Sequence, residues 1–239
     1  MLRDKLKNED YFKNRYEKDI IRLKKSLSNY YDEKNQTNEE KIPRIIYLDI
    51  VNKELLKFYS GYTLGLSVSQ FNEDINYIIQ YTLSSWIGTV YESIEKALEL
   101  AIIFDMRNEE INKLIDLLEK YNYKDKFLDL LANYINPEWK IRSDELQFKK
   151  AVGPLVEVVE LAATDKTKEV KRLKTYLDKQ WFNMQKEGLI TNSYHLKKNK
   201  YRGYWSIESA ALVKMLNLDD EELKECKYYP YDLAHYNRS

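Results

Sequence analysis

The sequence predicts an all-α fold, and three observations support this prediction. Apolar residues such as Phe12, Tyr16 and Leu23 recur at helical spacing along the chain. Only six glycines and four prolines interrupt its 239 residues, too few for a protein rich in β-turns. No segment shows the alternating Val, Ile and Thr pattern of a strand. We therefore expect a compact bundle of roughly 9–11 helices, compatible with two subdomains.

The helices of the N-terminal part are predicted from their start and stop signals. The first covers residues 3–34 and is interrupted at 35–38. Pro43 suits the first turn of the second helix, which we expect to end near Tyr59, just before Gly61. Asn108 is a plausible N-cap for one later helix, and another short helix is expected to start at Asp125. The further helices of this part are expected over 68–83, 85–105, 109–121 and 125–135.

A soft boundary near residues 136–143 separates the two expected domains, 1–140 and 141–239. In the second domain, Asp165 is a candidate N-cap and Gly188 a candidate C-terminal stop. Residues 188–205 are expected to form one long irregular segment. Ser206 is predicted to be the N-cap of a largely apolar helix. The helices expected in this domain cover 144–163, 165–187, 207–216 and 220–226.

Composition excludes several functional classes. The chain has 39 basic and 39 acidic side chains, which is unlike a general nucleic-acid or membrane-surface binder. Its 44% hydrophobic content is too high for a disordered chain. The single cysteine, Cys226, cannot form an intrachain disulfide. Together with the absence of a signal-peptide pattern and of a long apolar run, this predicts a soluble cytoplasmic protein. The 21 tyrosines are attributed mainly to composition bias.

Residues 201–239 contain the densest group of motifs. An aromatic loop, Tyr-Arg-Gly-Tyr-Trp, precedes the helix that contains Glu208 in its first turn. We expect Glu208 to be paired locally with backbone amides or with that loop, and less so to act as a catalytic acid or a partner contact. Asp219 and Glu222 have the spacing of a capping box, which we favour over a metal site. The turn Tyr228-Tyr-Pro-Tyr-Asp-Leu233 is expected to dock its tyrosines on the core.

This block resembles the C-terminal signature of the PoNi-type immunity proteins, which neutralise PoNe-type DNase toxins in competition between bacteria. The resemblance is most specific over residues 201–236, with Ser209 as a small departure, and upstream it rests on helix layout alone. It implies a compact all-α protein without catalysis that binds a toxin domain. The signature residues, which we expect to be structural, are Tyr204, Trp205, Ser206, Glu208, Asp219, Asp220, Tyr228, Tyr229, Pro230, Tyr231 and Asp232.

No motif of a known enzyme class is found in the sequence. His195 and His235 lack neighbours at zinc-binding spacing, and neither a phosphate-binding glycine loop nor a serine-nucleophile elbow is present. The acidic run before Cys226 is expected to raise the pKa of its thiol, which disfavours a nucleophile. We therefore expect no catalytic residue, no metal and no cofactor.

The middle of the chain carries an excess of acidic residues, which suggests where a partner binds. Residues 61–125 hold eleven acidic and five basic side chains. A DNase domain needs a basic groove for phosphate contacts, and an inhibitor that meets this groove gains from a complementary acidic patch. For each single acid, an ordinary solvated helix face is the alternative. The candidate contacts are Glu73, Asp74, Glu92, Glu95, Glu99, Asp105, Glu109, Glu110, Asp116 and Glu119.

The leading hypothesis is a cytoplasmic immunity protein that binds a cognate DNase toxin and protects the producer and its siblings, with no direct contact to nucleic acid or membrane. The alternative is a non-enzymatic α-helical scaffold that binds another protein. A helical RNase or another metal-dependent hydrolase is the weakest hypothesis. Toxin identity, affinity and oligomeric state do not follow from the sequence.

Overall fold

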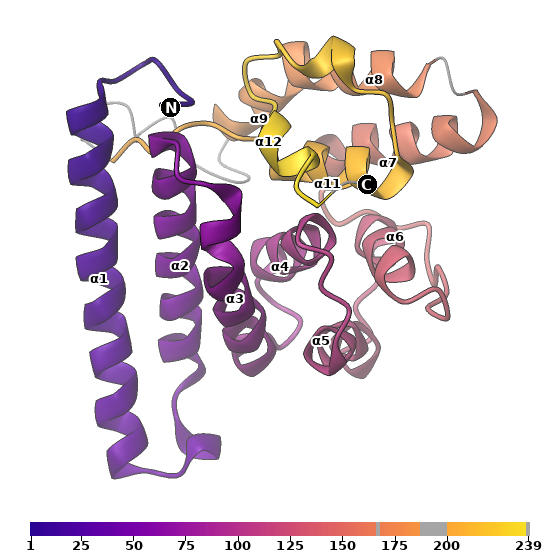
Figure 1. Cartoon of the computed structure of the whole chain (residues 1–239). Helices are drawn as coiled ribbons and strands as arrows, with labels where there is room; N and C mark the ends of the chain where they lie inside the picture. Colours follow the sequence, from indigo (N-terminus) through magenta and orange to yellow (C-terminus); the bar gives the residue numbers. More distant parts are fainter. Residues whose placement is uncertain (166–167, 187–199, 238–239) are drawn as a thin grey trace. The chain divides into compact units, whose positions relative to one another are not determined.

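The computed structural model of the protein describes residues 1–165, 168–186 and 200–237 (Figure 1). These residues form helices joined by turns and irregular segments, and among them no strand is present, which confirms the all-α prediction. None of the helices in this part of the chain is long and apolar enough to cross a membrane.

By its internal contacts the chain divides into two compact units. The first contains Met1–Ala97 with His195–Gly203, and the second contains Leu98–Tyr194 with Tyr204–Ser239. This division falls near residue 97 and not near 140. The expected domains 1–140 and 141–239 remain a prediction about independent folding, which a division by contacts does not address.

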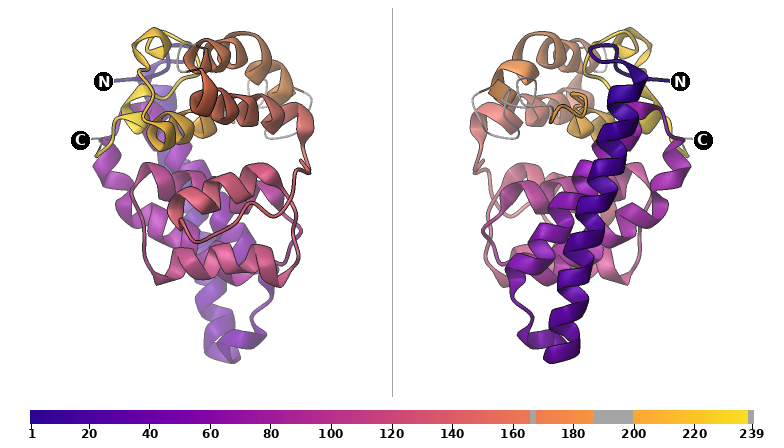
Figure 2. Two further views of the ribbon diagram at one scale, coloured as in Figure 1. Left: turned by 90° about the vertical axis from the view of Figure 1, so that its right-hand side faces the viewer. Right: turned by 90° about the vertical axis from the view of Figure 1, so that its left-hand side faces the viewer.

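The first unit is built on three long helices that lie side by side, α1 (Glu9–Gln36), α2 (Arg44–Leu64) and α3 (Asn72–Ser85) (Figure 2). Short 3-10 turns, Glu39–Lys41 and Val68–Phe71, precede α2 and α3. The core between the helices is apolar and fully buried. Its largest members include Phe12, Ile50, Phe58, Phe71 and Ile75.

Two boundaries in this unit differ from the predictions. α1 begins at Glu9 and not at residue 3, because the Asn8 side chain accepts a hydrogen bond from the Tyr11 amide at 2.9 Å and thereby starts the helix. α2 continues through Gly61, which was expected to lie beyond its end. Gly61 is needed for close packing: a Cβ there would lie 2.9 Å from Cε2 of Tyr16. The helix ends instead at Gly65, whose φ of +97° suits a glycine.

A buried ion cluster holds residues 200–203 against α1. Arg202 donates two hydrogen bonds to the Asp19 carboxylate, each 2.6 Å long. Arg22 and Arg15 approach the same carboxylate at 3.3 and 3.5 Å. The Asp19 side chain is fully buried, and Arg202 is only 7% exposed. We call these four residues the Asp19 cluster; it links two segments that are 183 residues apart in sequence.

Helix α4 (Tyr91–Ile103) is shorter than the predicted range of 85–105. The chain leaves α3 at Trp86, which has an extended backbone conformation. The Trp86 ring N–H donates to the carbonyl of Val90 at 3.0 Å and closes the turn that precedes α4. A local side-chain hydrogen bond thus replaces a turn of helix that apolar spacing alone would predict.

The second unit continues with α5 (Glu109–Lys120) and α6 (Lys126–Ile135). The predicted N-cap at Asn108 is confirmed, and Asp125, expected as the first residue of α6, is the N-cap of that helix. The Asn108 side chain accepts from the Ile111 amide at 3.0 Å, and the Asp125 side chain accepts from the Leu128 amide at 3.0 Å. Side-chain caps of this kind depend only on neighbours in sequence, so the sequence alone can identify them.

The helices that follow are α7 (Lys149–Thr164), α8 (Glu169–Thr175) and α9 (Phe182–Lys186), with a π turn at Tyr176–Trp181 between the last two. α7 begins later than the predicted residue 144. Asp165 is the C-cap residue of α7 and not the N-cap of α8, whose N-cap residue is Lys168. The expected stop at Gly188 and most of the expected loop 188–205, including His195, lie outside the described residues.

The unit ends with α11 (Ile207–Leu216), a 3-10 turn (Glu221–Leu223) and the short α12 (Tyr231–Ala234). α11 has the predicted bounds, and Ser206 is its N-cap residue. The Ser206 hydroxyl bonds Ser209 Oγ at 2.7 Å and makes no side-chain cap of the helix. Every residue from Ile207 to Val213 is buried, which agrees with a helix that is apolar on nearly all sides.

Candidate partner-binding site

Helix α5 presents an acidic surface. Its apolar residues, which include Ile111, Leu114 and Leu118, are fully buried. Its four acidic residues are all exposed, and Glu109, Asp116 and Glu119 lie along one side, because residues seven and three apart share a helix face. We call these three residues the α5 acidic face; Glu110 lies on the flank of the helix.

This face is only partly neutralised within the helix. Lys113 lies 2.6 Å from Glu109, one turn away, in an exposed ion pair. Exposed pairs of this kind contribute little to stability, because water screens them, and they leave the carboxylate accessible to solvent. A partner cation can therefore reach Glu109, Asp116 and Glu119 without breaking a buried contact.

Two of the predicted contacts are buried in the structure. Glu95 and Glu99 lie on α4 and are 2% and 0% exposed. They are four residues apart and share one face of the helix. Neither carboxylate can belong to an exposed surface of the chain.

The other predicted acids occupy several environments. Asp74 is largely covered and bonds Lys57 at 2.8 Å, and Asp105 pairs with Lys214 at 2.7 Å. Glu73 is exposed and accepts a hydrogen bond from the Tyr77 hydroxyl at 3.0 Å. Glu92 is half-buried. Glu73, Asp74 and Glu92 belong to the first unit, and the exposed acids of α5 belong to the second.

A tyrosine-lined recess of about 210 Å³ lies between the helices of the first unit. Tyr31 and Tyr77 are 54% and 37% exposed at its rim. Tyrosine offers a large amphipathic contact area at a binding surface, so the recess is a second candidate site. This recess was not predicted from the sequence, because the tyrosines were attributed mainly to composition bias. The i, i+4 spacing of Tyr77 and Tyr81 was the available signal. The five tyrosines of the recess are Tyr30, Tyr31, Tyr47, Tyr77 and Tyr81.

The C-terminal signature surrounds a buried carboxylate, that of Glu208. Glu208 is 2% exposed, and its Oε1 accepts hydrogen bonds from the Tyr176 hydroxyl at 3.0 Å and from the Trp181 ring N–H. These are not the partners expected for it, which were backbone amides or the 201–205 loop. The two donors are five residues apart, and the π turn brings them to the same side because its hydrogen bonds join residues i and i+5. We call these three residues the Glu208 cluster.

A second buried carboxylate, Asp220, orders the end of the chain. Its Oδ2 accepts from the Tyr229 hydroxyl at 2.5 Å, and its Oδ1 lies 2.9 Å from Nε2 of His235. The predicted capping box of Asp219 and Glu222 is absent: the short turn there begins after Asp220 and has no side-chain cap. Asp219 is exposed, whereas Asp220 is buried and bonds Tyr229 and His235.

The aromatic residues of the signature dock as expected. Tyr229 is buried, and Tyr204 and Trp205 are 7% and 9% exposed. Tyr228 lies against Trp181 and stacks on Phe182, with ring centroids 4.9 and 5.2 Å apart. Pro230 is buried, Tyr231 stacks on His235, and Asp232 is exposed in the first turn of α12. This burial favours a structural role for the signature.

Cys226 is buried, and burial raises the pKa of its thiol, with a smaller contribution from Asp178. The direction of the shift is the one predicted, but the main cause is desolvation and not the acidic run. Across the described part of the chain, no group of three or more His, Cys, Asp or Glu side chains is placed to hold a metal ion.

Residues 123–233 match a family model described as "PoNe immunity proteins (PoNi), C-terminal". The resemblance to PoNi immunity proteins is thereby confirmed. The matched range begins before α6 and ends within α12, so it contains the complete Glu208 cluster and the contact of Asp220 with Tyr229, whereas His235 lies beyond it. No curated protein and no solved structure matches this chain. The PoNi match therefore concerns the C-terminal part of the chain, and the surfaces described above are candidate contacts.

Proposed function

We propose that this protein binds a cognate DNase toxin of the PoNe class in the cytoplasm and neutralises it by stoichiometric inhibition. The match to the PoNi C-terminal model over residues 123–233 is the observation that carries this proposal. The protein protects the cell that produces the toxin, together with its siblings. Inhibition by binding requires a recognition surface and no catalytic group of its own.

The α5 acidic face is the proposed site of first contact. A nuclease must hold the DNA backbone with basic side chains, which makes its substrate groove positively charged. Glu109, Asp116 and Glu119 are exposed on one helix that is anchored by a fully buried apolar face. A rigid acidic surface of this kind speeds the encounter with a basic groove and fixes the orientation of the complex.

The proposal is tested with the purified toxin domain and plasmid DNA. Addition of this protein at about one equivalent should abolish cleavage, and the two proteins should elute together in gel filtration. No complex and undiminished cleavage would contradict the proposal and favour the alternative, an α-helical scaffold for another partner. The protein alone should cut neither DNA nor RNA with Mg²⁺, Mn²⁺ or Zn²⁺.

The contact site is tested by changing Glu109, Asp116 and Glu119 to Lys. We expect association to slow by about tenfold or more at low salt, because surface charges mainly determine the association rate. The matched control reverses Glu221, Glu222 and Glu225, three exposed acids in the same unit. Both variants should keep the helical circular dichroism of the wild type. Equal slowing in both would show that net charge, and not the α5 acidic face, is responsible.

A further inference from the structure

The tyrosine recess of the first unit has a floor of packed aromatic rings. Tyr30, Tyr47 and Tyr81 come from α1, α2 and α3, and all three are buried. Their ring centroids lie 5.5, 5.8 and 6.2 Å apart. Tyr77 stacks on Tyr81 at 6.1 Å, and Tyr31 meets Tyr30 edge-on at 5.3 Å. Because Tyr31 and Tyr77 are partly exposed, they form a rim through which a side chain of a partner can reach the floor.

The Tyr81 hydroxyl has no hydrogen-bond partner among the described residues, although Tyr81 is only 7% exposed. The other two floor hydroxyls are engaged: that of Tyr30 donates to Oε1 of Glu39 at 3.1 Å, and that of Tyr47 donates to the Glu39 carbonyl at 3.3 Å. Burial raises the pKa of Tyr81, so its hydroxyl stays protonated at neutral pH. Its oxygen can accept a hydrogen bond from a ligand in the recess.

The recess already holds a positive charge of this chain. Nζ of Lys34 lies 5.6 Å from the centroid of the Tyr30 ring, 3.4 Å from its hydroxyl and 3.5 Å from Oε1 of Glu39. The hydrogen bond to Tyr30 raises the pKa of Lys34, and the Glu39 carboxylate raises it further. The Lys34 and Glu39 side chains are 45% and 62% exposed, so this pair is weak and a second cation can replace it. Glu73, which bonds the Tyr77 hydroxyl, adds a carboxylate near the rim.

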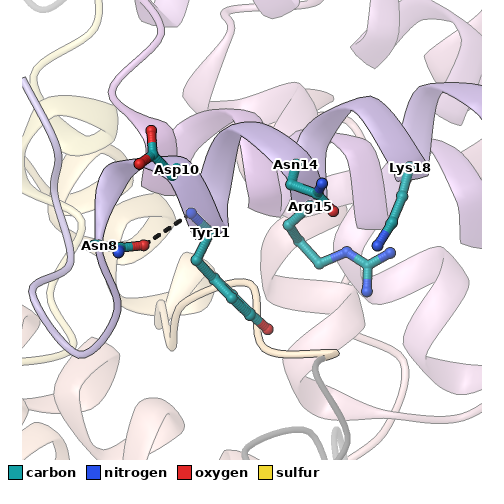
Figure 3. Close-up of a pocket in the computed structure, with 6 residues that line it drawn as sticks. All are labelled: Asn8, Asp10, Tyr11, Asn14, Arg15 and Lys18. Carbon is teal, nitrogen blue, oxygen red and sulfur yellow. Dashed lines mark hydrogen bonds between the residues drawn. The ribbon is translucent and has the colours of Figure 1, made fainter.

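The pocket of about 300 Å³ along α1 differs from the recess, because its polar groups serve the fold (Figure 3). The Asn8 side chain caps α1. The Tyr11 hydroxyl accepts from the Tyr201 amide at 3.0 Å and donates to the Tyr201 carbonyl at 3.3 Å. Arg15 belongs to the Asp19 cluster. These contacts lie within the chain, so the α1 pocket gives no reason to expect a ligand.

A guanidinium group matches the contacts that the recess offers. It is flat and weakly hydrated, so it stacks on an aromatic face, and its N–H groups lie in its plane, where they can still donate hydrogen bonds. The recess supplies both kinds of partner, exposed ring faces at the rim and acceptor oxygens on Glu39 and Tyr81. An ammonium group would only repeat the contacts that Lys34 already makes.

We propose that the tyrosine recess binds an arginine side chain of the partner protein. The guanidinium stacks against the rim rings of Tyr31 and Tyr77 and donates to the Glu39 carboxylate and the Tyr81 hydroxyl, while Lys34 moves into solvent. Arginine is frequent at the energetic centres of interfaces, and a DNase domain is rich in basic side chains. That this partner is the toxin rests on the proposed function; the kind of side chain follows from the recess itself.

The recess is tested first without the toxin, by NMR titration of the full chain with N-acetyl-arginine amide. The tyrosine rings are isotope-labelled, and Tyr31→Phe and Tyr77→Phe assign the two rim signals. N-acetyl-citrulline amide has nearly the same shape without the charge, and N-acetyl-lysine amide has the charge without the flat group. We expect saturable shifts of both rim rings with the arginine compound and binding about threefold weaker or less with the other two. No saturable shift, or an equal response to citrulline, would overturn the proposal.

Two variants should change this binding in opposite directions. Tyr81→Phe removes a hydroxyl that bonds no described residue, so the melting temperature should stay unchanged while the arginine compound binds about tenfold more weakly, as after loss of a hydrogen bond to a charged group. Lys34→Gln removes the competing cation and should strengthen binding by about twofold at low salt. Unchanged binding in Tyr81→Phe would contradict the contacts proposed here.

The toxin domain then shows whether the partner uses this recess. Tyr31→Ala should weaken the complex by about tenfold. The matched control is Ile21→Ala, which shortens another exposed side chain of α1 outside the recess and should leave the affinity unchanged. Equal affinity of Tyr31→Ala and the wild type would overturn this inference and leave the proposed function standing. A wild-type chain that forms no complex would overturn the proposed function, and with it the toxin as the source of the arginine.

Discussion

The Asp19 cluster and the Glu208 cluster solve the same problem in different ways. Each buries a carboxylate and uses it to join segments far apart in sequence. Asp19 is surrounded by arginines, the closest at 2.6 Å. Glu208 accepts hydrogen bonds from the neutral donors Tyr176 and Trp181. The first arrangement depends on charge, and the second depends on the direction of two hydrogen bonds.

The difference determines what happens when one partner is lost. When a buried charge loses its counter-charge, its desolvation is no longer compensated, so removal of one partner of a buried ion pair strongly destabilises the fold. A neutral donor that loses its acceptor is left unsatisfied, which costs about 1–3 kcal/mol. The two clusters should therefore respond with different magnitudes to a single substitution.

The largest effect is expected for Arg202→Met, which removes the bidentate partner of Asp19. The free energy of unfolding should fall by about 3–5 kcal/mol, as for other broken buried ion pairs. Urea denaturation followed by circular dichroism measures this change. The control is Arg22→Met, because Arg22 contacts the same carboxylate at 3.3 Å but is 43% exposed. A loss as small as that of the control would show that Arg15 and Arg22 compensate for the missing group.

A smaller loss, about 1–3 kcal/mol, is expected for Glu208→Gln. Both donors bond Oε1, which the amide oxygen can replace, but the uncharged acceptor weakens both charge-assisted hydrogen bonds. Urea denaturation again reports the change, and Trp181 fluorescence adds a local probe. Glu222→Gln, at an exposed position, should be neutral. An effect of Glu208→Gln as large as that of Arg202→Met would remove the distinction between the two clusters.

Glu54 tests whether a buried acid with an incomplete counter-charge destabilises the first unit. Burial raises the pKa of Glu54 to about 7 from its ordinary value of 4.5, although Lys57 lies 3.0 Å away. The folded state therefore holds the proton more tightly, so this group lowers the free energy of unfolding as the pH rises from 4.5 to 7.

The free energy of unfolding of the Glu54→Gln variant should accordingly rise relative to that of the wild type as the pH rises. Urea unfolding at pH 5 and pH 8 should show a difference between the two proteins that grows by about 1–3 kcal/mol in favour of the variant. Lys57 keeps its contact with Asp74 in the variant. A difference that stays constant between these pH values would contradict the raised pKa.

The smallest effect, about 1 kcal/mol, is expected for Tyr229→Phe, which removes one hydrogen bond to Asp220. His235 remains beside the same carboxylate. Thermal melts compare it with Tyr231→Phe, whose ring stacks on His235. We expect the melting temperature to fall for the first variant and to stay unchanged for the second. A fall in both would show that the hydroxyl of Tyr231 also contributes.

The sequence predicted the features that depend on neighbouring residues. Asn108 was predicted as a cap because its side chain can bond an amide three residues ahead, as it does with that of Ile111. The sequence did not predict features that depend on packing between distant residues. Gly61 was interpreted as a helix stop, but the close approach of Tyr16 requires a glycine within the helix. No local signal shows that Arg202 pairs with Asp19.

The candidate site was predicted only in part for a related reason. On α5, Asp116 and Glu119 lie opposite the apolar stripe and are exposed, as helical periodicity predicts. On α4, Glu95 and Glu99 also share one polar face, so periodicity predicts exposure, yet both are buried. Their burial depends on packing between elements, which local sequence does not show.

The π turn at Tyr176–Trp181 affects how chain length can vary here. In an α-helix, residues four apart share a face, whereas in a π turn residues five apart do. Loss of one residue between these aromatics would convert the turn to regular α-helix and still direct both donors toward Glu208. Shortening by one residue at Asp178–Gln180 should therefore be tolerated, although a deletion elsewhere in a buried helix would misplace every residue that follows. In an alignment of related chains, the two aromatic residues should be matched first, and the gap placed between them.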